Sequence, residues 1–134
     1  MSLNVQNENN LLDKLFLKAE ERPKYWNEYF EALMDSELVI LVSQPISKDF
    51  SGEIPLLMIS DNAGRQVIPL FTNKEHLKAI KGTFNAAEIK GIKLFKTLKN
   101  IPVVINPNTK MAKVLSPFEI KVITLEYLKK HEAM

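Results

Sequence analysis

The stretch of residues 67–77 constrains the fold of this chain more than any other, because it joins an apolar run directly to the start of a helix. Residues 65–70 predict a buried strand. Thr72 and Glu75 follow at the spacing of a capping box, in which each side chain bonds the backbone N–H of the other residue. The pattern predicts that the helix begins at this box, with Phe71 in the core beside it.

Two short amphipathic helices are predicted ahead of this junction. Apolar residues recur at helical spacing over residues 11–20 and again after Pro23, which fits the first position of a second helix. Residues 1–10 are polar and rich in asparagine, and we expect them to be frayed. The continuous apolar run over residues 38–42 then predicts a strand that is buried on both faces.

Strands and helices alternate through the rest of the chain. Residues 54–60 and 65–70 are predicted to pair as a hairpin around a turn at residues 61–64, where asparagine and glycine tolerate positive φ. Ser116 and Glu119 form a second predicted capping box. The remaining predicted elements are a helix over residues 73–80, a short strand over 83–87, a helix over 88–99, strands over 101–106 and 111–115, and a helix over 117–130.

The predicted order of elements is ααβββα(β)αββα. Hairpins combined with helical crossovers imply an α/β (α+β) fold, with a mixed sheet of about five to six strands and helices packed on it. A chain of 134 residues forms one domain on length alone. We expect this domain to span residues 11–134.

The sequence contains few groups of the kind that enzymes use. Cysteine is absent, which excludes thiol nucleophiles, zinc–thiolate sites and disulfides. The two histidines, His76 and His131, are predicted on separate helices and at the surface, and the four glycines are too far apart for a phosphate-binding loop. We therefore expect no catalytic site, no metal site and no cofactor.

The sequence also lacks the usual signals for export or membrane insertion. The first ten residues have neither the basic nor the apolar part of a secretory leader. No apolar run approaches the roughly 20 residues that cross a bilayer. We expect a cytoplasmic protein that does not engage a membrane.

Charge is distributed unevenly along the chain. Residues 1–53 hold ten acids and five bases, a balance of −5, whereas residues 54–134 hold six acids and thirteen bases, a balance of +7. The segment Lys90–Lys113 is therefore an alternative binding site for nucleic acid or another polyanion. A solvated lysine face is the preferred interpretation, because the chain has only two arginines, the usual readers of phosphate and guanine. Four lysines recur at spacing three in the predicted helix: Lys90, Lys93, Lys96 and Lys99.

The loop over residues 43–53 is the predicted binding site for a partner protein. Apolar residues of the helices and strands fall on packing stripes and are assigned to the core, whereas Ile46 and Phe50 lie in an otherwise polar loop. Phe50 would be the anchor, with Lys48 and Asp49 as its polar rim. In the alternative interpretation, Phe50 folds back over the sheet as a structural lid.

Two patterns at the ends of predicted strands are similar to those of a known family. Ile68–Leu77 fits a Pro-x-Phe-Thr-Ser-x-Glu-x-Leu pattern, except that Asn73 stands in place of the serine. Asn106 and Pro107, followed by Leu115–Ile120, fit an Asn-Pro … Leu-x-x-x-Glu-Ile pattern. Together they resemble the N-terminal domain of the SseB family.

The resemblance covers roughly residues 11–123 and implies a mixed α/β domain of a bacterial cytoplasmic protein. It implies a stand-alone N-terminal domain, without the C-terminal SseB domain of longer members. It brings no reaction, because no catalytic residues are established for the family. The family name is also linked with serine sensitivity and with type III secretion.

These observations favour a non-enzymatic protein-binding module that acts as an adaptor or regulator. A specific alternative is an immunity protein that neutralises a secreted toxin by direct binding, with the acidic N-terminal helices covering a basic active site. Weak polyanion binding is the alternative of another class. An enzyme is the third hypothesis, because no catalytic constellation is visible.

Overall fold

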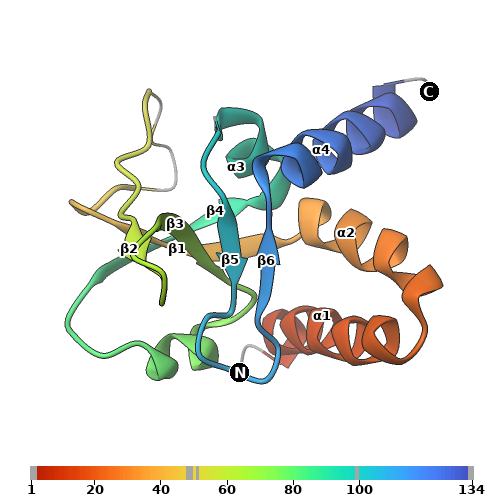
Figure 1. Ribbon diagram of the computed structural model, residues 1–134, viewed down its shortest axis with the longest axis horizontal. Coiled ribbons are helices and arrows are strands. Elements are labelled where there is room, and N and C mark those ends of the chain that lie inside the picture. The colour runs from red at the N-terminus through yellow and green to blue at the C-terminus, as the bar shows by residue number, and fades with distance from the viewer. Residues whose placement is uncertain (1–2, 48–49, 51, 99, 133–134) are drawn as a thin grey trace.

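A six-stranded mixed sheet with helices packed on it forms the fold, which confirms the predicted class (Figure 1). The computed structural model describes residues 3–47, 50, 52–98 and 100–132. The elements in chain order are α1 (Leu3–Glu21), the 3₁₀ helix η1 (Pro23–Tyr25), α2 (Trp26–Asp35), β1 (Glu37–Val42), β2 (Ile59–Ser60), β3 (Gln66–Phe71), the 3₁₀ helix η2 (Lys74–Ala79), β4 (Asn85–Lys90), α3 (Gly91–Thr97), β5 (Val103–Ile105), β6 (Lys113–Leu115) and α4 (Pro117–Glu132).

The strand order of the sheet is β4-β1-β3-β5-β6, with β2 paired to β3 outside this path. All neighbours are antiparallel except β3 and β5, which run parallel in a register that places Ile68 beside Val103. The chain between these two strands forms η2, β4 and α3. The carboxyl ends of β3 and β5 therefore meet at one edge of the sheet.

The two faces of the sheet are covered differently. One face, with Ile40 and Leu70 at its centre, packs against side chains from α1, α2, α3 and α4 and forms the main core. The opposite face buries Val39, Leu41 and Phe71 in a smaller cluster. Phe71 is fully buried, as predicted. The smaller cluster is completed by Leu57, Leu77 and Ile80.

Helix α1 is longer than predicted at its N-terminal end. It begins at Leu3, so residues 3–10, which were expected to be frayed, are helical. Once a helix has nucleated, each added residue gains a backbone hydrogen bond for the one residue that is fixed, so a polar segment can extend it. Within the described part of the chain, no helix combines the length and apolar character needed to cross a membrane.

The segment before α3 also differs from the prediction. Residues 85–90 form β4, which pairs along the whole of β1, and the helix begins only at Gly91. The prediction of a helix from residue 88 was wrong because β1 would otherwise leave its backbone groups unpaired at this edge. Lys90 therefore lies on a strand, so it does not share a helical face with Lys93 and Lys96.

The strand predicted over residues 54–60 is regular only at its end, in β2. The backbone N–H of Ser43 donates to Pro55 at 2.9 Å, and that of Leu57 donates to Leu41, also at 2.9 Å. Residues 59–60 pair instead with β3. The segment is irregular because it changes partner from β1 to β3 partway along.

The helix start at Ser116 matches the prediction. The backbone N–H of Glu119 donates to the Ser116 hydroxyl at 3.1 Å, and the N–H of Ser116 donates to the Glu119 carboxylate at 3.1 Å. This is the reciprocal pattern of a capping box. Both partners are close in sequence, so a local pattern was sufficient to predict it.

Candidate functional site

Thr72 lies at the carboxyl end of β3 and is fully buried. Its hydroxyl donates to Asp13 Oδ1 at 3.0 Å and accepts from Asn106 Nδ2 at 3.0 Å. Its backbone N–H donates to Asn106 Oδ1 at 2.9 Å. The family pattern thus places Thr72 and Asn106 side by side at the ends of the parallel strands, where Asp13 of α1 joins them.

The second carboxylate oxygen of Asp13 extends the same cluster. Asp13 Oδ2 accepts from Asn73 Nδ2 at 3.1 Å and lies 3.0 Å from His76 Nε2. The side chains of Asp13 and His76 are only 17% and 16% exposed, so the prediction that His76 lies at the surface was wrong. The sequence could not indicate this contact, because Asp13 and His76 are 63 residues apart.

The capping box predicted at Thr72 and Glu75 is absent from η2. The N-cap is Asn73, whose side chain accepts from the backbone N–H of His76 at 3.2 Å. Glu75 instead pairs with Lys78 at 2.9 Å in solvent, and this contact lowers the pKa of Glu75. The Thr72 hydroxyl is unavailable for capping because it is already bonded to two distant side chains.

The cluster around Asp13 fastens α1 to the sheet. In open α/β sheets, ligands commonly bind at the carboxyl ends of parallel strands, and here α1 fills that position. The Thr72 hydroxyl is engaged as both donor and acceptor, and His76 and Asn73 share one oxygen of Asp13. We interpret the cluster as structural, because its polar groups satisfy one another.

Thr72→Val tests this interpretation. The substitution keeps the shape of the side chain but leaves Asp13 Oδ1 and Asn106 Nδ2 without the hydroxyl, which should cost about 1–2 kcal/mol of stability. Glu75→Ala is the matched control and should change the free energy of unfolding by less than about 0.5 kcal/mol, as is usual for an exposed residue. Urea denaturation of both variants is the measurement. If Glu75→Ala lowered the free energy of unfolding more than Thr72→Val does, the result would contradict this interpretation and favour the predicted capping box.

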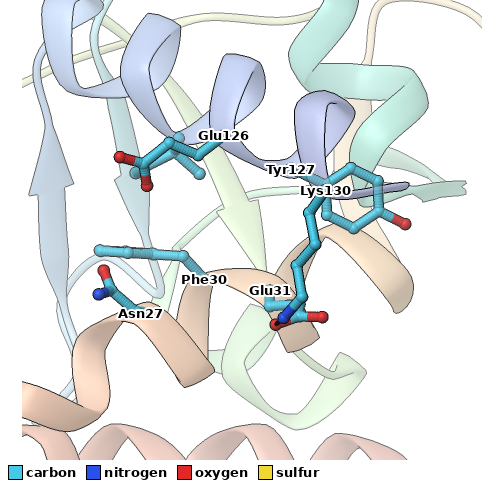
Figure 2. Close-up of a pocket in the computed structure, with 7 residues that line it drawn as sticks. Asn27, Phe30, Glu31, Glu126, Tyr127 and Lys130 are labelled. Atoms are coloured by element: carbon cyan, nitrogen blue, oxygen red, sulfur yellow. Dashed lines mark hydrogen bonds and ion pairs between the residues drawn. The ribbon is translucent and has the colours of Figure 1, made fainter. Parts of the chain in front are cut away.

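A second polar contact region joins α2 to α4 beside a small pocket of about 170 Å³ (Figure 2). Lys130 Nζ of α4 lies 2.8 Å from Glu31 Oε2 of α2, and Figure 2 shows Lys130 reaching toward that carboxylate. The Tyr127 hydroxyl donates to Asp35, and this hydrogen bond raises the pKa of Tyr127 to about 12. His131 stacks on Tyr127, with ring centroids 4.0 Å apart.

This α2–α4 contact brings together a group that the sequence did not reveal. The ligand atoms of Glu31, Asp35 and His131 lie within 4.8 Å of one another, which is close enough for a metal ion. Both carboxylates already have partners on α4, since Glu31 accepts from Lys130 and Asp35 from Tyr127. The group is therefore explained by helix pairing, and it supplies no separate indication of a ligand.

Helix α4 presents apolar side chains to solvent. Phe118, Val122 and Leu125 are 69%, 38% and 56% exposed, whereas Ile120 and Thr124 face the core. The exposed residues follow the spacing i, i+4, i+7 and so form one stripe, the α4 outer face. The prediction that apolar residues of regular elements belong to the core was wrong for this helix, which is apolar on two opposite sides.

A groove of about 520 Å³ separates α3 from α4. Among the residues that the structure describes, the charged side chains in its lining are Lys96 and Lys121. A neighbouring depression shares Leu98 and Ile101 with the groove and extends it to Glu53, the last residue of the predicted partner loop. The apolar residues that line the α3–α4 groove are Phe95, Leu98, Ile101, Pro117, Ile120, Leu125 and Leu128.

The predicted partner loop is only partly described. Ile46 is half-buried and packs against the main core, and Phe50 is also half-buried. Lys48 and Asp49 lie outside the described residues. Whether this loop binds a partner stays a prediction, although Ile46 has a clear packing role.

The described lysines of the segment Lys90–Lys113 lie on different elements. Lys113 Nζ lies 4.1 Å from the centre of the Trp26 ring, in a cation–π contact. Lys90 is on β4, Lys93 and Lys96 are on α3, and Lys99 lies outside the described residues. The predicted stripe of four lysines on one helix is therefore wrong.

The sequence matches a known protein family over most of its length. No curated protein and no solved structure matched the sequence. The family model of the SseB protein N-terminal domain matches residues 12–121, which include the Asp13 cluster and the start of α4. Because this match covers most of the chain, the chain belongs to the SseB N-terminal domain family.

Proposed function

We propose that this chain is a protein-interaction domain that binds an apolar, acidic segment of another protein in the α3–α4 groove. The observation that supports the proposal is the lining of the groove, which is largely apolar and whose charged side chains, within the described part of the chain, are lysines. A few apolar anchors in such a groove usually supply most of the affinity. Lysines at the rim favour a partner with carboxylates and speed its association.

The polar clusters elsewhere support a binding role over a catalytic one. The hydroxyl, amide and imidazole groups around Asp13 are hydrogen-bonded to one another. The carboxylates of Glu31 and Asp35 are bonded across the α2–α4 contact. A catalytic acid, base or nucleophile must be free to meet a substrate, and these groups are engaged in holding helices in place.

The loop that carries Phe50 fits the same proposal. Its last two residues, Gly52 and Glu53, line the continuation of the groove. A partner segment that followed the groove past Leu98 would reach this loop. Phe50 would then add an anchor at that end.

Lys96→Glu tests the groove, because Lys96 is exposed, lines the groove and lies on α3 rather than on α4. Tagged wild-type protein and the variant would be used to capture proteins from the native host after nuclease treatment. We expect a protein that wild type captures in low salt, that is retained less at high salt, and that Lys96→Glu loses. Lys81→Glu makes the same charge change at an exposed position outside the groove and should retain it.

The identity of the captured protein would also distinguish an immunity protein from an adaptor. A toxin would identify an immunity protein, and a secretion component would identify an adaptor. Loss of all binding after nuclease treatment would favour the polyanion alternative. Equal capture by wild type and Lys96→Glu would contradict binding in the α3–α4 groove.

A further inference from the structure

We infer that the α4 outer face binds a second copy of this chain, with the two α4 helices side by side and parallel. This inference goes beyond the proposed function, which concerns the groove. Helix α4 lies at the periphery of the molecule in Figure 1. Its outer face, formed by Phe118, Val122 and Leu125, is exposed in the isolated chain. Such a stripe on the side opposite the core gains stability only when another surface covers it.

The spacing on α4 suits a second α4 helix. Val122 and Leu125 occupy positions a and d of a heptad, and Phe118 occupies the preceding d position. A β-branched residue at a with leucine at d favours two parallel strands over three or four. The apolar stripe thus specifies a helix pair by both its period and its residue types.

Charge beside the stripe supports the same partner and the same orientation. Lys121 falls at position g and Glu126 at position e, on opposite sides of the apolar stripe. In a parallel pair, position g of one helix lies near position e of the next heptad on the other helix. Each Lys121 would therefore face Glu126 of the other copy, twice by symmetry. An antiparallel pair would place like charges together.

The side chains needed for these ion pairs are accessible. Lys121 and Glu126 are both exposed, and neither has an ion-pair partner among the described residues. The seam contains three apolar residues over about two turns, so the area that it buries is well below the roughly 1,000 Å² typical of a stable interface. We therefore expect a weak dimer that forms with rising protein concentration.

Sedimentation of purified protein from about 1 µM to about 1 mM would measure this association, across the range where weak complexes form. We expect a monomer–dimer equilibrium that Val122→Asp removes, while circular dichroism stays unchanged because Val122 is at the surface. Lys121→Glu and Glu126→Lys should each weaken the dimer by about tenfold or more, since each replaces two attractive pairs with two repulsive ones. Mixing the two variants should restore dimers, because every cross-pair is then attractive.

The orientation has its own test, because the chain contains no cysteine. Leu125→Cys should form a disulfide-linked dimer on mild oxidation, since equivalent d positions meet in a parallel pair. Protein that stays monomeric at all concentrations would overturn the inference, as would a dimer unchanged by Val122→Asp or by the charge reversals. A dimer in which Leu125→Cys fails to cross-link would overturn the parallel arrangement. Lys121 and Leu125 also line the α3–α4 groove, whereas Val122 and Glu126 do not, so Val122→Asp and Glu126→Lys test the dimer without changing the groove lining.

Discussion

Phe71→Ala is expected to lower the free energy of unfolding by about 3–5 kcal/mol. The side chain of Phe71 is 0% exposed to solvent and packs with Val39 and Leu41 on the second face of the sheet. Removing the ring forfeits its burial and leaves a cavity that η2 can close only in part, because Thr72 beside it is held by Asp13. Urea denaturation monitored by circular dichroism would give the change.

Phe118→Ala is the matched control for this prediction. It removes the same ring from a position that is 69% exposed, so the stability should stay within about 0.5 kcal/mol of wild type. A denaturation midpoint for Phe71→Ala equal to that of Phe118→Ala would show that the second face of the sheet is not packed as described. The pair thus separates the core role of one phenylalanine from the surface role of the other.

Much of the fold was predictable because its signals are local. The continuous apolar run of β1 and the apolar end of β3 both gave strands close to the observed ones. The turn after β2 was also predicted, and Asp61 supports it by accepting from the backbone N–H groups of Ala63 and Arg65. In each case the residues that decide the structure lie within a few positions of one another.

The predictions were wrong where a residue distant in sequence determines the local structure. Thr72 and Glu75 have the spacing of a capping box, but Asp13, 59 residues from Thr72, takes the hydroxyl. Residues 88–99 have an apolar period that suits a helix, but pairing with β1 makes residues 88–90 a strand. No pattern within a window of a dozen residues contains the information that would settle these two segments.

The candidate surfaces were predictable to different degrees. The α3–α4 groove joins side chains from α3, the following loop and α4, so only the tertiary structure reveals it. The α4 outer face was visible in principle, because Phe118, Val122 and Leu125 form a second stripe opposite Ile120 and Thr124. It was missed because every apolar residue of a regular element was assigned to the core.

Within the part of the chain that the structure describes, Tyr29 places an unsatisfied polar group in the core. Its hydroxyl is buried and is without a hydrogen-bond partner among the described residues. Burial raises the pKa of Tyr29, and the nearby Asp13 carboxylate raises it further. The ring makes edge-to-face contacts with Phe16 and Trp26, at centroid distances of 5.6 Å and 5.5 Å. The aromatic cluster therefore anchors α1 to α2, while Asp13 anchors α1 to the sheet.

Gly91→Ala is expected to lower the free energy of unfolding by about 3 kcal/mol, the upper end of what overpacking usually costs. Two effects oppose each other at this first residue of α3. Alanine is the better helix former, by about 1 kcal/mol, so helix propensity alone predicts a more stable protein. Packing predicts the reverse, because a Cβ at Gly91 would lie 2.1 Å from the carbonyl oxygen of Leu33 and 2.9 Å from Met34 Cα.

Packing should decide the sign of the Gly91→Ala effect, because the atoms in the way belong to the backbone of α2 and cannot rotate aside. Gly91 also donates its N–H to the Ser36 carbonyl at 2.9 Å, so moving α3 away from α2 would weaken that hydrogen bond as well. Lys90→Ala, one residue earlier and exposed, is the control and should change stability by less than about 0.5 kcal/mol. Urea denaturation of both variants gives the comparison. A variant Gly91→Ala that is as stable as wild type, or more stable, would mean that α3 and α2 do not approach as closely as described.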